Sequence, residues 1–395
     1  MGNGSGPVQA LVLSGGAAFG AYEVGVVQAL TEGNCPATGG RPLEPSILTG
    51  TSVGAYNATV LACHPERPAA EAAAHLADLW RRRIAEGPGR CGNGVYRLRA
   101  NPLPFFDPTC LLRHPLAPLR AAVEDGSFLA RFALGRGLGL ASGNQPVADW
   151  LLDLLDLEAV FSAEPLHTLV AETVDLAGLA RSCQQLILVA ANWRDGSVRL
   201  FTREEIVERV GRTAVLASSA LPGIFPQVEI DGVPFADGGL VMNTPLRPAI
   251  RAGADELHVV YVDPLIEDMP LDISAGTLDT LYRGLAISWA NNVNNNVLDV
   301  KIVNQALELV ELLSTEQRLA LEQRLSALGD LAARLRQRRN SPAYRPLVVH
   351  RYRPSVDLGS AHGLLDFGHQ RIAERIAQGY RDAQNHDCLA SGCVL

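Results

Sequence analysis

The sequence predicts an α/β fold built on a mainly parallel sheet, and two strand–turn–helix patterns near the N-terminus are the main evidence. In the first, the apolar run 10–14 leads into a glycine-rich turn and a helical pattern at 15–30. In the second, the apolar residues 47–49 precede G-T-S-V-G at 50–54, and an alanine-rich helical pattern follows at 55–63. Parallel strands that are each followed by a helix bring their carboxyl ends to one edge of a sheet, where ligand sites form.

The second turn has the G-x-S-x-G pattern of a nucleophile elbow, with Ser52 at its centre. Gly50 and Gly54 would let the neighbouring backbone pass without a Cβ clash. The N-terminus of the following helix favours negative charge developing near the serine oxygen. The alternative is a glycine-rich turn whose serine only caps a helix, because serine is a preferred N-cap residue.

The first turn, Gly15 to Gly20, can offer backbone N–H groups to whatever Ser52 attacks. It also resembles the G-x-G-x-x-G pattern of dinucleotide-binding proteins. That alternative is weak, because Ala17 replaces the middle glycine and only Glu44 stands near the expected position of the ribose-binding carboxylate.

Two hairpins and a helical region are expected further along the chain. Asp195-Gly196 and Asp231-Gly232 each separate two short apolar runs, a pattern typical of hairpins. The second hairpin leads directly into Asp237-Gly238-Gly239. The remaining predicted elements are a small-residue helix at 213–220, a strand at 257–262, a helical stretch from 278 that includes 305–337, a strand at 347–352 and a closing helix at 370–383.

We divide the chain into a core at 8–264, a mainly helical extension at 265–383 that completes the domain, and a tail at 384–395. Residues 1–7 are expected to be a disordered N-terminus or an expression remnant. The core contains an irregular insertion or cap at 64–185, where six prolines interrupt the stretch from Arg81 to Arg136.

A serine nucleophile needs a proton acceptor that the fold positions beside it. Asp237 is the preferred candidate, because Gly238 and Gly239 free the backbone next to it. In an α/β-hydrolase the acceptor would instead be a histidine late in the chain. The histidines placed late enough are His350, His362 and His369.

Four blocks of the sequence together resemble, in the same order, those of the patatin-like phospholipases. The resemblance covers about residues 8–63 and 186–264. It implies an α/β fold of three layers, α/β/α, with a mainly parallel central sheet. The blocks are Leu13 to Gly20, Gly50 to Ala58, Ser218 to Pro226 and Asp237 to Leu240.

The resemblance also implies a Ser52-Asp237 dyad without a catalytic histidine, acting on fatty-acyl esters of lipids through an acyl-serine intermediate. It implies an oxyanion hole formed by the backbone of Gly15, Gly16 and Ala17. Gly20, Gly238 and Gly239 are further motif glycines. No cofactor is expected. Two alternatives remain open, an acyltransferase that uses the same site and a catalytically silent lipid-binding protein.

Two positions depart from the family pattern. Ala17 stands where the family usually has a third glycine, and it can still donate its N–H group if its φ angle is negative. Phe19 stands where the family usually has arginine or lysine. Without that cation we expect the entrance of the cleft to attract phosphate less, which favours neutral or lysolipid esters.

The insertion is rich in arginine, with ten arginines and four carboxylates between Arg81 and Arg136. One hypothesis is a lid that meets anionic lipid headgroups through arginines such as Arg81, Arg82 and Arg83 and meets acyl chains through its apolar residues. The alternative is a solvated insertion with a small core of its own.

Composition and charge limit the class of protein, its location and its partners. The chain has 395 residues, 47% of them hydrophobic and 19% charged, which is typical of a globular protein. It contains neither a signal peptide nor a run of about 18 uncharged apolar residues, so we expect a cytoplasmic location with at most transient membrane contact. The net charge of −8 gives no general attraction to nucleic acid.

The seven cysteines are scattered and contain no C-x-x-C pair. This pattern argues against a disulfide framework and against a structural zinc site, and it favours a reducing compartment. No calcium loop of EF-hand spacing is present, so no metal is assigned.

Overall fold

The computed structural model describes most of the chain. The described residues are 6–86, 92–99, 101, 108–113, 115–141, 160–262 and 346–395, with short pieces between 280 and 317. Most of the helical stretch expected after residue 278, including nearly all of 305–337, lies outside these ranges, as do residues 1–5.

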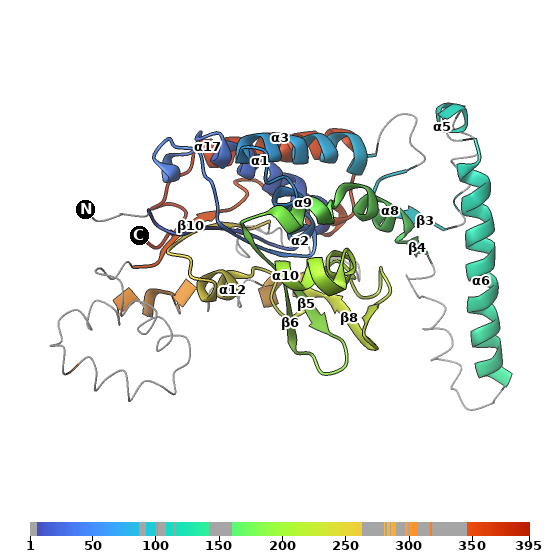
Figure 1. The fold of residues 1–395 in the computed structure, drawn as a ribbon. Coiled ribbons are helices and arrows are strands. Elements are labelled where there is room, and N and C mark those ends of the chain that lie inside the picture. Colours follow the sequence, from blue (N-terminus) through green and yellow to red (C-terminus); the bar gives the residue numbers. More distant parts are fainter. Residues whose placement is uncertain are drawn as a thin grey trace.

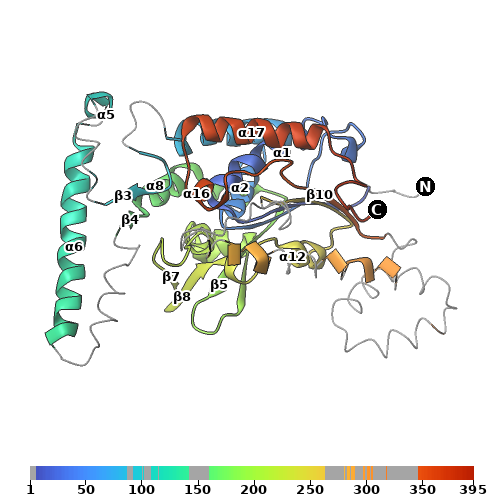
Figure 2. The ribbon, with the colours of Figure 1, turned by 180° about the vertical axis from the view of Figure 1, so that it is seen from behind.

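A mixed eight-stranded sheet lies at the centre of the molecule (Figures 1 and 2). Its order is β10-β9-β1-β2-β5-β8-β7, with β6 paired to β5. The first five strands of this order are parallel, and β6, β7 and β8 are antiparallel to their neighbours. The strands are β1 Gln9–Leu13, β2 Ile47–Thr51, β5 Gln185–Asn192, β6 Val198–Thr202, β7 Val228–Ile230, β8 Val233–Asp237, β9 Glu256–Val260 and β10 Val348–Tyr352.

Helices cover both faces of this sheet. One face carries α1 Gly20–Thr31, α2 Val53–Ala62, α3 Ala69–Leu79 and α17 His369–Gln384, and the other carries α12 Leu246–Arg251 (Figure 1). The remaining helices are α5 Pro108–Arg113, α6 Ala117–Ala141, α8 Glu164–Thr173, α9 Leu176–Arg181, α10 Arg203–Glu205, α11 Thr213–Ser218 and α16 Ser360–Leu364. Shorter turns of helix are η1 Ala17–Phe19, η2 Pro36–Thr38, η3 Trp80–Ile84, η5 Ile206–Val210 and η6 Gly238–Leu240.

Strand β1 shows how the sequence divides its side chains between the two faces. Leu11 and Leu13 join the core beneath α1, α2 and α17, whereas Ala10 and Val12 join the core beneath α12. Successive residues of a strand point to opposite faces, so an uninterrupted apolar run is what a strand buried on both faces requires. The predicted three-layer α/β/α fold with a mainly parallel sheet is therefore confirmed.

Both predicted hairpins are also confirmed. Strands β5 and β6 pair across the Asp195-Gly196 turn, and β7 and β8 pair across Asp231-Gly232. Asp231 and Gly232 both have positive φ angles, of 53° and 75°, as a type I′ hairpin turn demands.

The closing helix α17 packs against α1, and Figure 2 shows it lying over that helix. The two backbones approach so closely that a Cβ atom on Gly25 would collide with the carbonyl of Ile376. Gly379 faces the carbonyl of Tyr22 in the same way. The C-terminal segment also returns to the sheet as β10, beside β9.

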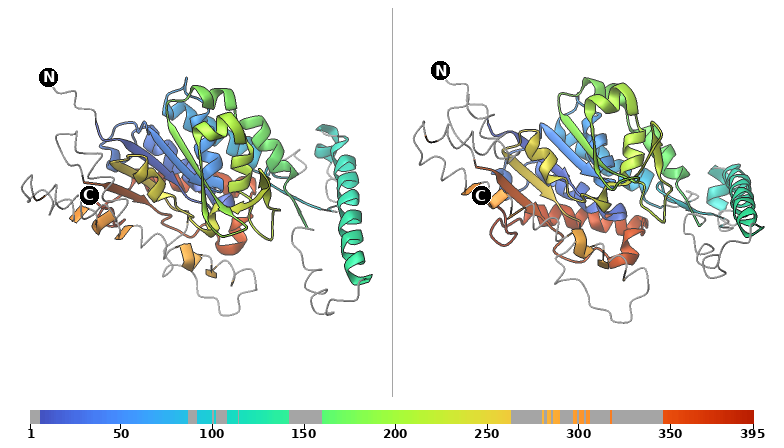
Figure 3. Two further views of the ribbon diagram at one scale, coloured as in Figure 1. Left: turned by 60° about the horizontal axis from the view of Figure 1, so that its bottom comes forward. Right: turned by 90° about the horizontal axis from the view of Figure 1, so that it is seen from below.

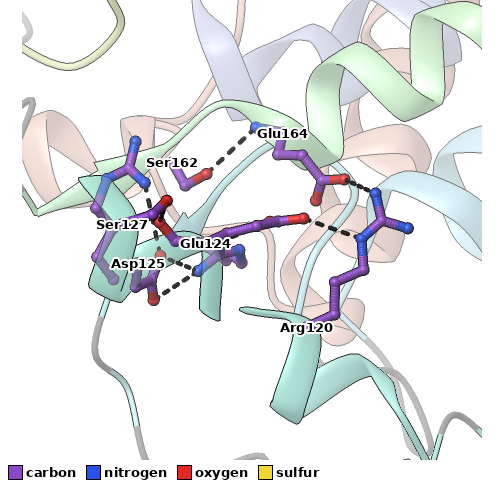
Figure 4. Close-up of polar contacts among 8 residues, drawn as sticks. Arg120, Glu124, Asp125, Ser127, Ser162 and Glu164 are labelled. Carbon is purple, nitrogen blue, oxygen red and sulfur yellow. Dashed lines mark hydrogen bonds and ion pairs between the residues drawn. The ribbon is translucent and has the colours of Figure 1, made fainter. Parts of the chain in front are cut away.

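The insertion contains more helix than the sequence suggests. Its longest element, α6, stands at one side of the molecule (Figures 1 and 3), close to the short pair β3 Arg97–Leu98 and β4 Phe161–Ser162. Ion pairs join α6 to this region, as Figure 4 shows. Arg97 bonds Asp125 at 2.7 Å, and Arg120 lies 2.9 Å from Glu124 and 3.7 Å from Glu164.

Ion pairing also bears on the hypothesis that arginines of the insertion contact lipid. Arg82 lies 2.7 Å from Asp78, and Arg83 pairs with Glu172. These arginines already have carboxylate partners within the protein.

The structure bears on two expectations drawn from composition, which concern membrane-spanning helices and disulfide bonds. None of the helices within the described ranges combines the length with the apolar character that a bilayer span requires. Cys110 takes part in a disulfide bond. The expectation against disulfides is therefore wrong at this position, and the argument for a reducing compartment loses its basis.

Candidate active site

Ser52 occupies a sharp turn between β2 and α2. Its φ and ψ angles are 55° and −123°, a strained conformation for a residue with a side chain. The turn is tight because a Cβ atom on Gly50 would collide with Gly54 O, and one on Gly54 would lie 2.5 Å from Leu13 O. Glycine at both positions therefore lets β1, β2 and α2 approach one another.

The hydrogen bonds of Ser52 separate the two interpretations of the motif. Ser52 is the N-cap residue of α2, but its side chain accepts no capping hydrogen bond. Its hydroxyl instead lies beside the Asp237 carboxylate and lowers the pKa of that group. Its N–H group donates to Ser218 Oγ at 2.9 Å, and that hydroxyl donates to Val189 O at 2.6 Å. A purely capping role does not account for this arrangement.

The register of β5 brings Asp237 to Ser52. One edge of β5 pairs with β6, so β2 and β8 share the opposite edge. On that edge Thr51 lies opposite Val189, and Asp237 lies opposite the next residue, Ala190. The end of β8 therefore continues where β2 stops, and residues far apart in the sequence become neighbours.

Asp237 is buried, with 3% of its surface exposed. Burial raises the pKa of its carboxyl group to about 6, although hydrogen bonds from Ser52 and from Gly239 N, at 2.7 Å, oppose the rise. A Cβ atom on Gly238 would collide with the carbonyl of Val189. Gly238 therefore lets the backbone pass close to β5, and Gly239 N donates to the carboxylate.

The three residues expected to form the oxyanion hole differ in their backbone contacts. Gly15 N already donates to Asn243 O at 3.1 Å, and Asn243 Nδ2 donates back to Gly15 O at 3.1 Å. Within the described residues, the N–H groups of Gly16 and Ala17 donate to no acceptor. Ala17 has a φ angle of 44°, so the condition of a negative angle is not met, although its N–H group has no acceptor within the described residues. This positive angle explains why a glycine would be favoured there.

Phe19 does not stand at the entrance of the cleft. It is 1% exposed and lies in the core, with the guanidinium of Arg375 5.0 Å from its ring centroid. That arginine comes from α17 and donates to Leu358 O and Gly363 O at 2.8 and 2.9 Å. The argument that Phe19 weakens attraction of phosphate at the entrance is therefore wrong. Gly20, the next motif residue, packs closely against Val53.

A cleft of about 870 Å³, its open mouth included, lies over Ser52 and Asp237. Asp237 is the only charged residue among the described residues that line it. Most of the other lining side chains are apolar, namely Val53, Tyr56, Trp80, Ile84, Val95, Leu166, Leu169, Leu221, Phe225, Trp289, Leu364, Leu365 and Phe367.

The late histidines are not brought to the cleft, since none of its described lining residues is a histidine. His350 lies on β10, where its Nε2 is 3.5 Å from Glu256 Oε1. Neither His362 nor His369 is among the lining residues. The geometry thus favours an aspartate as the partner of Ser52.

Three residues that support the site were not singled out from the sequence. Ser218 accepts the Ser52 N–H, Asn243 holds the first glycine turn, and Trp289 donates from its indole to Gly239 O at 2.7 Å. Ser218 lies inside one of the resembling blocks, which was the available signal. Nothing in the local sequence marks Trp289, because its contact depends on the tertiary fold.

The fold and the cleft define a three-layer α/β/α protein with a serine elbow at the carboxyl ends of its parallel strands. A family model described as patatin-like phospholipase matches residues 11–250. The chain therefore belongs to the patatin-like phospholipase family, a family of lipid acyl hydrolases. This assignment also removes the dinucleotide-binding alternative for Gly15 to Gly20.

Among solved structures, the chain is similar to VipD from Legionella pneumophila, with 16% sequence identity and a TM-score of 0.38. The similarity covers 96% of this chain but 66% of that one, so the chain spans slightly less than two thirds of its length. No curated protein sequence matches.

Proposed function

We propose that the protein hydrolyses fatty-acyl esters of lipids, with Ser52 as the nucleophile and Asp237 as the general base. The observation that carries this proposal is the placement of the Ser52 hydroxyl beside a buried carboxylate in an apolar cleft. A carboxyl group with a pKa near 6 is ionised at neutral pH and is still basic enough to accept a proton.

The proposed reaction has two steps. Asp237 takes the Ser52 proton as Oγ attacks the ester carbonyl, and the proton then passes to the leaving alcohol as the ester C–O bond breaks. In the second step Asp237 takes a proton from water, the hydroxide attacks the acyl-serine, and the proton returns to Ser52 Oγ with release of a fatty acid. Both steps pass through an oxyanion that needs N–H donors.

We assign those donors to Gly16 and Ala17, whose N–H groups have no acceptor within the described residues. Gly15 acts indirectly in this proposal, because Asn243 holds its N–H and carbonyl and so fixes the turn. Loss of one oxyanion donor costs about 10²–10³ in turnover in comparable sites.

The lining of the cleft bears on the substrate. Apolar side chains suit an acyl chain, and the described lining offers no cation to a phosphate within the cleft. We therefore favour neutral esters or lysolipids over substrates whose phosphate must enter. Transfer of the acyl group to an alcohol instead of water remains the second candidate, because the cleft is open at its mouth.

The test is hydrolysis of a lipid panel, with products identified by mass spectrometry and the protein labelled by a fluorophosphonate. We expect labelling of the wild type but not of Ser52→Ala, and loss of hydrolysis in Ser52→Ala and Asp237→Asn. Ser46→Ala, which removes an exposed serine next to β2, is the matched control and should retain both properties. Absence of labelling in a folded wild type would instead favour a lipid-binding protein. Acyl-alcohol products formed with added lysolipid would favour the transferase.

Membrane contact is the other part of the proposal, and we assign it to apolar side chains. Leu116, Leu119 and Val123 follow a helical spacing and are 72%, 58% and 66% exposed. Vesicles of neutral lipid should sediment the wild type but not Leu119→Asp/Val123→Asp. The control is Val356→Asp, a residue 65% exposed elsewhere on the surface. Equal sedimentation of all three proteins would contradict this assignment.

A further inference from the structure

Four side chains of metal-binding types meet at the β10 edge of the sheet. The C-terminus lies beside this edge (Figures 1 and 2). His350 comes from β10, His386 follows α17, and Cys388 and Cys393 lie in the last eight residues. One ligand atom from each of these residues lies within 4.8 Å of the other three. Both histidines are buried, with 5% and 8% of their surfaces exposed.

The separations match those in a tetrahedral zinc site. Cys388 Sγ lies 3.4 Å from His350 Nδ1 and 3.5 Å from His386 Nε2, and Cys393 Sγ lies 3.4 Å from His386 Nε2. With Zn–S of about 2.3 Å and Zn–N of about 2.0–2.1 Å, tetrahedral geometry places sulfur and nitrogen about 3.5 Å apart. Ordinary hydrogen bonding explains the cluster less well, because His386 Nε2 faces two sulfur atoms and has only one proton or one lone pair to share.

Outer contacts orient the ligands as they do in metal sites. His350 turns Nδ1 toward the sulfur atoms while its Nε2 lies 3.5 Å from Glu256 Oε1. His386 turns Nε2 toward them while its Nδ1 lies 3.4 Å from Ser391 Oγ. A histidine that binds metal through one nitrogen usually donates from the other to an oxygen acceptor. Arg351 N donates to Cys393 Sγ at 3.3 Å, which fixes the position of this sulfur atom.

The tail is folded around the cluster. Val394 pairs with Val349 of β10 through two hydrogen bonds, from Val349 N to Val394 O at 2.8 Å and from Val394 N to Val349 O at 2.9 Å. Between the cysteines, Cys393 N donates to Cys388 O at 2.9 Å, and Gly392 turns the chain with a φ angle of 64°. The spacing is C-x₄-C, within the range of zinc-binding pairs, whereas the sequence argument considered only C-x-x-C.

We propose that His350, His386, Cys388 and Cys393 bind one structural Zn²⁺ ion. Two thiolates and two neutral imidazoles balance the charge of the ion and complete its four-coordinate shell, which leaves no position for a substrate. His350, His258, Leu11 and Leu48 lie in one row across the sheet, and Ser52 is four residues beyond Leu48. The ion would therefore be roughly 20 Å from Ser52.

A second group of metal-binding side chains, Glu256, His258 and His350, overlaps the first. Glu256 Oε1 lies 3.3 Å from His258 Nε2, and His258 Nδ1 lies 2.8 Å from Tyr352 OH. Because His350 Nε2 faces Glu256 while Nδ1 faces the sulfur atoms, we assign Glu256 to the outer shell of the same site.

The test measures zinc in the full-length protein after incubation with ZnCl₂ under reducing conditions and removal of loosely bound metal. We expect about one Zn²⁺ per chain in the wild type and a loss of at least tenfold in Cys388→Ser and Cys393→Ser. Cys183→Ser, which alters an exposed free cysteine, should retain the ion. A wild type without bound zinc, or cysteine variants that keep it, would overturn the proposal.

A titration of the metal-free wild type with Co²⁺ keeps the proposal testable if the cysteine variants fail to fold. Tetrahedral thiolate coordination gives Co²⁺ strong visible bands and a sulfur-to-cobalt charge-transfer band, and Zn²⁺ should remove both at one equivalent. Glu256→Gln should weaken zinc affinity about 10–100-fold, measured by competition with a chelator. Octahedral Co²⁺ spectra without the sulfur band would contradict the assignment of these ligands.

Discussion

Replacing the base candidate Asp237 by asparagine should stabilise the protein while it removes activity. Burial raises the pKa of this carboxyl group from an ordinary 3.8 to about 6. The folded state thus binds the proton more tightly than the unfolded state, and the ionised form costs stability. The difference between the two pKa values corresponds to about 3 kcal/mol of unfolding free energy above pH 7.

The pH dependence distinguishes this effect from a general change in packing. Below about pH 3 the Asp237 carboxyl is protonated in both states, so the penalty disappears. As pH rises through the folded-state pKa near 6, Asp237 of the wild type ionises and its contribution to the unfolding free energy is lost, whereas the Asp237→Asn variant has no titrating group at this position. The variant should therefore gain about 3 kcal/mol over the wild type at pH 7.5 and almost nothing at pH 3.

Urea unfolding at several pH values measures both quantities. Because the two proteins share every other titrating group, the difference between their unfolding free energies isolates this one side chain. Asp231→Asn, in an exposed turn, should change the unfolding free energy by less than about 0.5 kcal/mol at any pH. An advantage of Asp237→Asn that is absent at pH 7.5, or equally large at pH 3, would refute the inference that burial perturbs this carboxyl group.

The other predictions concern the turns around the site. Ser218→Ala should lower the unfolding free energy by about 1–3 kcal/mol, because the part-buried Ser52 N–H loses its acceptor. Denaturant titration measures the loss, and an unchanged unfolding midpoint would contradict the prediction. Ala17→Gly should raise the unfolding free energy by about 0.5–1 kcal/mol, because glycine adopts a φ angle of 44° without strain, and activity should be retained. A loss of stability would show that the backbone is not strained at this position. Gly50→Ala should destabilise by about 3 kcal/mol, because its Cβ atom would overlap Gly54 O, and full stability would mean that the turn can widen.

The local features of the fold could be predicted from the sequence because each depends on neighbouring residues. Apolar runs gave the strands, and two-residue turns gave the hairpins. The nucleophile elbow followed from G-x-S-x-G beside a strand and a helix. These patterns act over a few residues, so they do not depend on where the segment packs.

The features that were missed depend on long-range register and packing. Nothing near Phe19 shows that it faces the core under Arg375 of a distant helix. The φ angle of Ala17 is imposed by the turn and not by alanine itself. The cluster of His350 with Cys388 and Cys393 forms only because the tail returns to pair with β10. Such contacts follow from the assembled sheet, which a single sequence does not specify.

The stability cost at Asp237 and the strain at Ser52 belong to one physical arrangement. A base of pKa near 4 would take a serine proton poorly, and burial is what raises the pKa. Burial is in turn possible because β8 ends against β5 exactly one residue beyond the end of β2. The same shared edge draws Ser52 into a turn with positive φ. Substitutions that relax either feature should therefore gain stability and lose turnover together.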